Sequence, residues 1–179
     1  MPGAGRSAFL AAACATVTGI AGAHGDGLLG PAPTTPAKPP PAVAASPAAP
    51  PAPGSPTALV KPFYEHFGLE LDPTQRGNFT DPARKVLDDN EALQKSGQGD
   101  CLDPNMALDN AAADRAQIAS SLKTLEAVDG DQAKVVVGFV EDGKPHRLEW
   151  KLRKLGGAWK IADLLSVTGE WELSQYQCE

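Results

Sequence analysis

Alternating apolar and polar residues mark the C-terminal half of the chain. From position 133 to 140, and again from 146 to 153, an apolar or aromatic residue recurs at every second position. This period of two is typical of strands that bury one face. The pairs Asp129-Gly130, Asp142-Gly143 and Gly156-Gly157 are turn-forming, so we predict a meander of three or four antiparallel strands that ends with a strand from Ala158 to Ser166. The positions expected on its buried face are Ala133, Val135, Val137, Phe139, His146, Leu148, Trp150, Leu152, Trp159 and Ile161.

Helical spacing precedes the strands. Pro62 must either begin or kink a first short helix, because it lacks a backbone N–H. A second helix is expected from Pro82 to about Lys95, with Thr80 or Asp81 as its N-cap. Helices followed by an antiparallel meander predict an α+β fold, in which the N-terminal helices pack on one face of a curved antiparallel sheet. The first helix is indicated by Leu59, Val60, Phe63 and Phe67, and the stretch from Ala111 to Ala127 is expected to change from helix to strand.

The first 23 residues predict an exported protein. Arg6 precedes an apolar stretch from Ala8 to Ile20, and Ala21-Gly22-Ala23 fits the small-residue site at which signal peptides are cleaved. The mature chain is therefore expected to begin at His24, in the periplasm or outside the cell. A retained membrane anchor and a lipoprotein with its lipid on Cys14 are the alternatives.

Composition divides the remainder into two segments. Residues 24–56 are rich in Pro and Ala, which cannot supply a core and favour an extended, disordered linker. Residues 57–179 are enough for a single α+β domain with a core of its own. The expected organisation is thus a signal peptide (1–23), a linker (24–56) and one domain (57–179).

Charge and cysteine content narrow the possible partners. The chain has 16 Lys and Arg against 22 Asp and Glu, with no basic run, which argues against nucleic acid. No apolar span of about 18 residues follows the N-terminus, so no transmembrane helix is expected in the mature chain. Removal of Cys14 with the signal peptide leaves Cys101 and Cys178, and an even count in an oxidising compartment favours a disulfide between them. They lack the further ligands of a zinc site, so no metal site is expected.

Five segments together resemble a known bacterial family. They are Leu59-Val60-Lys61-Pro62-Phe63-Tyr64, Phe79-Thr80-Asp81-Pro82-Ala83, Asp103-Pro104, Ala133-Lys134-Val135-Val136-Val137-Gly138-Phe139 and Gly157-Ala158-Trp159-Lys160-Ile161-Ala162-Asp163-Leu164. This arrangement looks like the domain of unknown function 3828, which is placed in the nuclear transport factor 2-like (cystatin-like) superfamily. The resemblance covers most of residues 57–179 and implies a cone of helices wrapped by a curved antiparallel sheet.

The same resemblance supplies the candidates for chemistry. Enzymes of that superfamily place acids, His or Tyr inside the cone, which makes Tyr64, His66, Asp163 and, less so, Asp103 weak catalytic candidates. An apolar wall there can raise the pKa of a carboxyl group and make it a general base. A structural role is the alternative for each, and His146 is expected to be a half-buried rim residue. The acidic loop formed by Asp100, Asp103, Asn105, Asp109, Asn110 and Asp114 lacks the spacing of an EF-hand, so we expect a capped turn there, with weak cation binding as the alternative.

Three functions fit these observations. The first is a non-enzymatic binding module that contacts an envelope protein or a small apolar ligand and uses no cofactor. The second is a small enzyme acting on a hydrophobic substrate in the cone, and the third is a toxin-neutralising (immunity) protein. An open cone that holds a buried acid favours the enzyme, whereas a cone plugged by Trp150, Trp159 and Phe139 favours binding. We predict that the face bearing Trp150, Trp159 and Phe139 is the inner wall of the cone and acts by packing or binding.

Overall fold

The computed structural model describes residues 50–179, which fold into the expected α+β domain. The predicted signal peptide and most of the predicted linker lie outside the described residues. Within 50–179, no helix is both long and apolar enough to cross a membrane.

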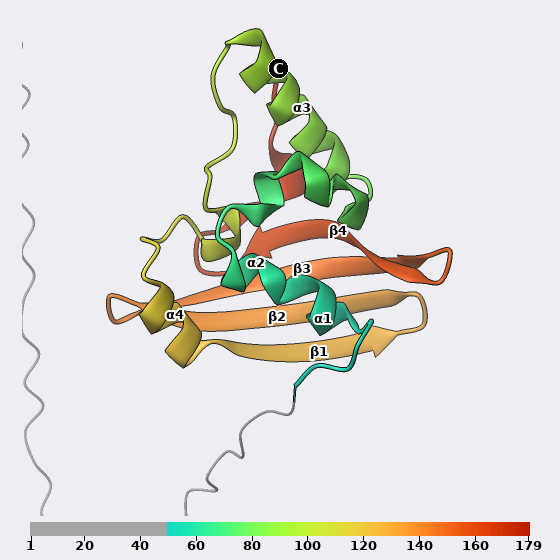
Figure 1. Cartoon of the computed structure of the whole chain (residues 1–179), viewed down its shortest axis with the longest axis vertical. Coiled ribbons are helices and arrows are strands. Elements are labelled where there is room, and N and C mark those ends of the chain that lie inside the picture. The colour runs from blue at the N-terminus through green and yellow to red at the C-terminus, as the bar shows by residue number, and fades with distance from the viewer. Residues whose placement is uncertain (1–49) are drawn as a thin grey trace, which may run out of the picture. The chain divides into compact units, whose positions relative to one another are not determined.

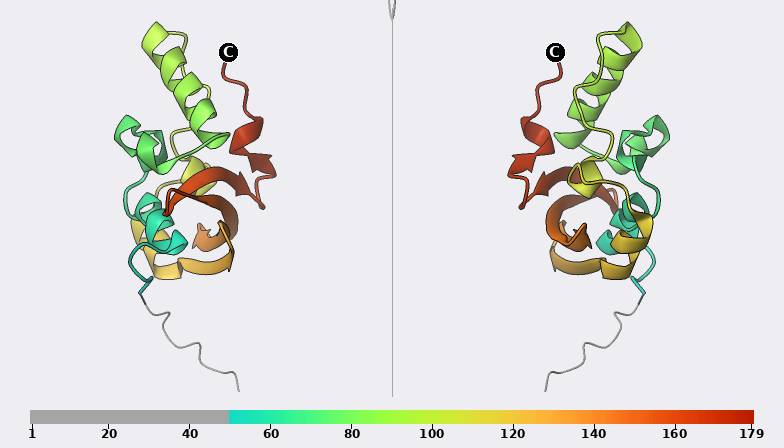
Figure 2. Two further views of the ribbon diagram at one scale, coloured as in Figure 1. Left: turned by 90° about the vertical axis from the view of Figure 1, so that its right-hand side faces the viewer. Right: turned by 90° about the vertical axis from the view of Figure 1, so that its left-hand side faces the viewer.

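The sheet is a simple meander. Its five strands are β1 (Lys123–Asp129), β2 (Gln132–Glu141), β3 (Lys144–Leu155), β4 (Ala158–Ser166) and β5 (Trp171–Glu172). Each strand pairs antiparallel with the next along the chain. The sheet is curved and does not close, and most of the helical segments lie against its concave side (Figure 1, Figure 2). We call the concave side the inner face and the opposite side the outer face.

The first three of the four hairpins turn at the predicted pairs or, for Asp129-Gly130, one residue later. Asp129 pairs with Gln132, Glu141 with Lys144, and Leu155 with Ala158, so each connection has two residues. Gly130 (φ 56°) and Gly143 (φ 73°) adopt the positive φ that such tight turns require.

The helices are short except for α3. They are α1 (Pro56–Val60), α2 (Pro62–Glu65), α3 (Ala83–Ser96) and α4 (Arg115–Ser121), with single turns η1 (Leu69–Leu71), η2 (Pro73–Asn78), η3 (Met106–Leu108) and η4 (Leu173–Gln175). Pro62 separates α1 from α2, as its missing N–H requires. The predicted cap of α3 is wrong: its N-cap is Pro82, and no side chain bonds the first turn. The reason is that the preceding backbone is engaged with β4, where the Thr80 N–H donates to the Ile161 carbonyl at 2.8 Å.

A disulfide joins the loop after α3 to the end of the chain. Cys101 and Cys178 are bonded, with their Cα atoms 5.5 Å apart, as predicted. Helix α3 extends away from the sheet, and the C-terminal segment runs beside it (Figure 2). The Cys101 N–H donates to Asn90 of α3 at 2.8 Å, so the bond ties the tail to a loop that is itself held on this helix.

Candidate functional site

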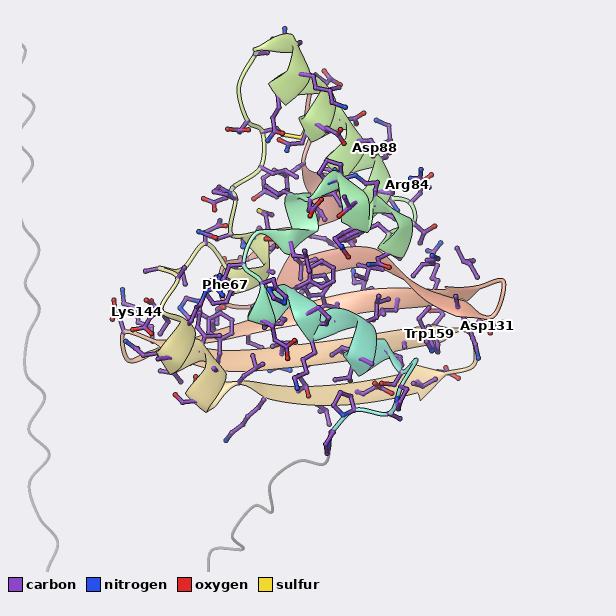
Figure 3. The ribbon with its side chains drawn as sticks, viewed as in Figure 1. Phe67, Arg84, Asp88, Asp131, Lys144 and Trp159 are labelled. Atoms are coloured by element: carbon purple, nitrogen blue, oxygen red, sulfur yellow. A yellow bond between two sulfur atoms is a disulfide. The ribbon has the colours of Figure 1, made fainter. Side chains whose placement is uncertain are left out.

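The inner face of the sheet is filled with aromatic side chains. Trp150 on β3 is fully buried, and its ring centroid lies 4.9 Å from that of Phe63. Its Nε1 donates to the Tyr64 hydroxyl at 2.9 Å, and Phe139 packs 6.1 Å from the Tyr64 ring. Side chains crowd the space between helices and sheet (Figure 3). Phe139 and Trp150 thus plug the cone, which is the arrangement that would favour binding over catalysis.

Trp159 does not belong to this plug. It is partly exposed near the end of the sheet, close to the hairpin that holds Asp131 (Figure 3). Its ring lies 5.6 Å from the Lys154 ammonium, which partners it across the strands. The alternation placed Trp159 on the correct face. Its position is the second after the Gly156-Gly157 turn, at the end of the strand, and lies beside the core instead of within it.

The catalytic candidates lie in three different environments. Tyr64 is buried inside the cone, and this burial raises the pKa of its hydroxyl far above the usual range. His66 is exposed at the end of α2. Asp163 pairs with Lys151 on the outer face of the sheet, and Asp103 is exposed. The predicted residues therefore do not assemble into one site.

Asp163 holds the C-terminal segment to the sheet. Its carboxylate accepts hydrogen bonds from the Ser174 N–H (3.1 Å) and hydroxyl (2.7 Å). Burial, followed by the nearby Glu172 carboxylate, raises the pKa of Asp163. The residue lies in the middle of β4, beside a bulge. Its hydrogen bonds to Ser174 support the structural alternative.

The fold also brings together a buried Asp–His pair that sequence spacing did not indicate. The Asp109 Oδ2 atom lies 3.0 Å from His146 Nδ1 and accepts a hydrogen bond from the Thr168 hydroxyl at 2.7 Å. Its Oδ1 atom accepts from Trp171 Nε1 at 3.0 Å. A Cβ atom at position 169 would lie 2.6 Å from this carboxylate, so Gly169 leaves room for it. Burial opposes ionisation, but the hydrogen bonds outweigh it and hold the pKa of Asp109 below its usual range.

Only weak signals in the sequence point to this pair. His146 is half-buried, as expected, but Asp109 comes from the acidic loop 37 residues earlier. Every oxygen of Asp109 faces a donor from the protein itself, so the pair joins the loop to β3 and to the β4–β5 connection. The other carboxylates of the loop are engaged locally, as in the cap that Asp114 forms on α4. Among the described residues, no group of three or more His, Cys, Asp or Glu side chains is placed to hold a metal ion.

Glu70 is a second buried acid. It is 2% exposed, and its Oε1 accepts a hydrogen bond from the Ala107 N–H at 3.0 Å. Its Oε2 is buried without a partner. Burial raises the pKa of this carboxyl group, which was not among the candidates because an isolated Glu in a short turn carries no sequence signal.

An open hollow lies on the opposite side of the sheet. It has a volume of about 400 Å³ and is lined by residues at one end of strands β1 to β4 and by Pro82. Its charged lining consists of Asp129, Lys134, Lys151, Arg153 and Asp163. We call this feature the outer-face hollow.

Two charged side chains of the outer-face hollow, Arg153 and Asp129, form no salt bridge within residues 50–179. Lys134 pairs with Glu149 at 2.8 Å, and Lys151 pairs with Glu172 and Asp163. Arg153 is exposed and forms no salt bridge within residues 50–179. From position 123 to 172, the whole span of the sheet, the chain has eight Lys and Arg against nine Asp and Glu, so the sheet as a whole is nearly neutral.

Comparisons with known proteins identify no family. No family model matches the sequence, and no curated protein matches it, so membership of the domain of unknown function 3828 stays a prediction. A chain of the type VI effector–immunity complex Tae3–Tai3 from Ralstonia pickettii is 18% identical, with a TM-score of 0.44 over 69% of this chain and 99% of that one. A phospholipid-binding protein from Ralstonia solanacearum, solved with a phospholipid, is 18% identical, with a TM-score of 0.29 over 63% of this chain and 57% of that one. We therefore base the function on the residues of this chain.

Proposed function

We propose that the protein is an exported, non-enzymatic binding module whose partner contacts the outer face of the sheet. One contrast carries the proposal: aromatic side chains fill the inner face, whereas an open hollow of about 400 Å³ lies on the outer face. Ligand sites are concave and usually preformed. The outer-face hollow meets both conditions.

The placement of the titratable residues supports binding over catalysis. A general base must come within hydrogen-bond reach of a substrate. Tyr64 and Glu70 are buried in the packed interior, and Asp109 is fully engaged by protein donors. Asp163 lines the hollow, but its carboxylate is occupied by Ser174 and Lys151.

Within the hollow, the Arg153 guanidinium favours a partner that presents an acidic side chain. Arg153 is free to meet a carboxylate with paired hydrogen bonds, which its planar guanidinium suits. Lys134 and Lys151 are already neutralised by acids of the same chain. A protein of the cell envelope that presents an Asp or Glu side chain fits this arrangement better than a wholly apolar ligand.

Site-specific crosslinking in the source organism tests the proposal. A photoreactive residue at position 153 should capture one defined partner, which mass spectrometry identifies. The same residue at Arg84, an exposed arginine on α3 (Figure 3), is the control and should not capture it. Equal capture at both positions, or capture at Arg84 alone, would contradict a site on the outer face.

Toxin neutralisation is a specific form of such binding. It is tested by co-expression with the exported products of neighbouring genes. A product that kills cells lacking this protein, and spares cells that carry it, would establish this role. Loss of protection with Arg153→Glu, but not with Arg84→Glu, would assign the protection to the outer-face hollow.

A further inference from the structure

Strand β1 forms an edge of the sheet that pairs with no other strand of residues 50–179 besides β2. It pairs with β2 on one side only, and all seven of its residues are exposed. Leu125 on the outer face is 71% exposed, and Val128 on the inner face is 53% exposed. The register with β2 runs from Lys123 to Asp129 without a bulge. Proteins usually blunt such edges with bulges, prolines, very short strands or charged side chains, because a free edge pairs readily with another strand. Of these devices β1 has only its three charges, Lys123, Glu126 and Asp129.

The opposite edge of the same sheet is short. β5 has two residues and is followed at once by the turn η4. Asp163 and Ser174 bond that turn to β4. The contrast points to β1 as the edge left open for pairing.

The sequence of β1 is complementary to itself in the antiparallel direction. If two copies pair about Glu126, Lys123 of each lies opposite Asp129 of the other, both on the outer face. Leu125 then faces Ala127 on the same side, and Thr124 faces Val128 on the inner side. Directly opposed residues of this kind, of opposite charge or both apolar, stabilise antiparallel pairs.

The two copies of Glu126 would face each other at the centre. Each carboxylate is already held by its own chain, since it accepts hydrogen bonds from the Thr57 N–H (2.8 Å) and hydroxyl (2.6 Å). These bonds draw the charge toward α1. They reduce the repulsion that two free carboxylates would exert at this position.

We propose that β1 pairs with β1 of a second copy to form a two-fold symmetric dimer with a continuous ten-stranded sheet. A closed two-fold contact uses the same surface on both copies, which brings the opposite charges at the two ends of β1 together. The pairing leaves the outer-face hollow of each copy open at its β2–β4 side. This proposal is independent of the partner proposed above.

Analytical ultracentrifugation of the mature chain and of charge-reversal variants tests the pairing. The parent protein should sediment as a dimer. Lys123→Asp and Asp129→Lys should each weaken the dimer at least tenfold, because each places like charges at both ends of the paired strands. The double substitution restores opposite charges and should restore the dimer. Lys144→Asp, at an exposed lysine of another hairpin (Figure 3), is the control and should not change the mass.

Three results would overturn this pairing. They are a parent protein that sediments as a monomer, a dimer that neither single substitution weakens, and a double variant that stays as weak as the singles. Thermal unfolding of each variant alone shows that its fold is intact. Asp129 also lines the outer-face hollow, but self-association is measured without any partner, so its failure is distinct from a failure of partner binding.

Discussion

The disulfide allows a quantitative prediction about stability. Cys101 and Cys178 are separated by 77 positions, and closing a loop of this length lowers the entropy of the unfolded chain. The chain-entropy relation gives about 4.5 kcal/mol at 25 °C. Reduction should also free the last residues of the native chain. The entropy that they gain stabilises the reduced native state and offsets part of the loss. We therefore expect reduction to lower the free energy of unfolding by about 3 to 4.5 kcal/mol.

The fold itself should survive reduction. The tail is held independently of the disulfide by the buried Leu173 and by the bond from Trp171 to Asp109. Denaturant unfolding, followed by tryptophan fluorescence with and without a phosphine reductant, measures the difference. The variant with both cysteines replaced by alanine is the control and should match the reduced parent in either buffer. A difference below about 1 kcal/mol would refute the reasoning, because the loop term alone exceeds it.

Three buried polar groups give further predictions, each measured by urea unfolding. Tyr64→Phe should lower the free energy of unfolding by about 1–3 kcal/mol, because it leaves the Trp150 N–H buried without an acceptor. An unchanged free energy of unfolding would contradict that hydrogen bond. The pKa of Glu70 is raised above 4.5 by burial, so its contribution falls as pH rises above 4.5. Glu70→Gln should therefore gain stability relative to the parent as pH rises above 4.5, by about 1.4 kcal/mol in total for each unit by which the pKa is raised. The pKa of Asp109 is lowered from 3.8, so its contribution is present above pH 3.8 and is lost as pH falls through the lowered value. Asp109→Asn should lack that acid-side loss, and an unchanged acid profile would contradict the assignment.

The sequence pattern predicted the sheet well, because the alternation within a strand and the turn-forming pairs depend only on neighbouring residues. Period-two alternation fixed the faces of β2 and β3, and the Asp-Gly pairs fixed two hairpins. The same logic located the break at Pro62. It failed at the start of α3, where pairing with β4 competes with side-chain capping and no local signal records that competition.

The candidate sites depended on contacts that sequence does not reveal. Asp109 meets His146 only because the loop after η3 folds back onto β3. The outer-face hollow is formed by residues of four strands and by Pro82. Among the described residues, Arg153 is its only unpaired cation because Lys134 and Lys151 form salt bridges with acids of the same chain. Periodicity identified the charged face of β3 but could not separate paired from unpaired charges on it.

Binding on the outer face is tested most directly by titration calorimetry with the partner captured at position 153. Arg153→Glu should weaken binding at least tenfold, whereas Arg84→Glu, which makes the same change in net charge on α3, should leave the affinity unchanged. Equal affinities for the parent and Arg153→Glu would contradict the account, as would conversion of the partner into a new product during the titration.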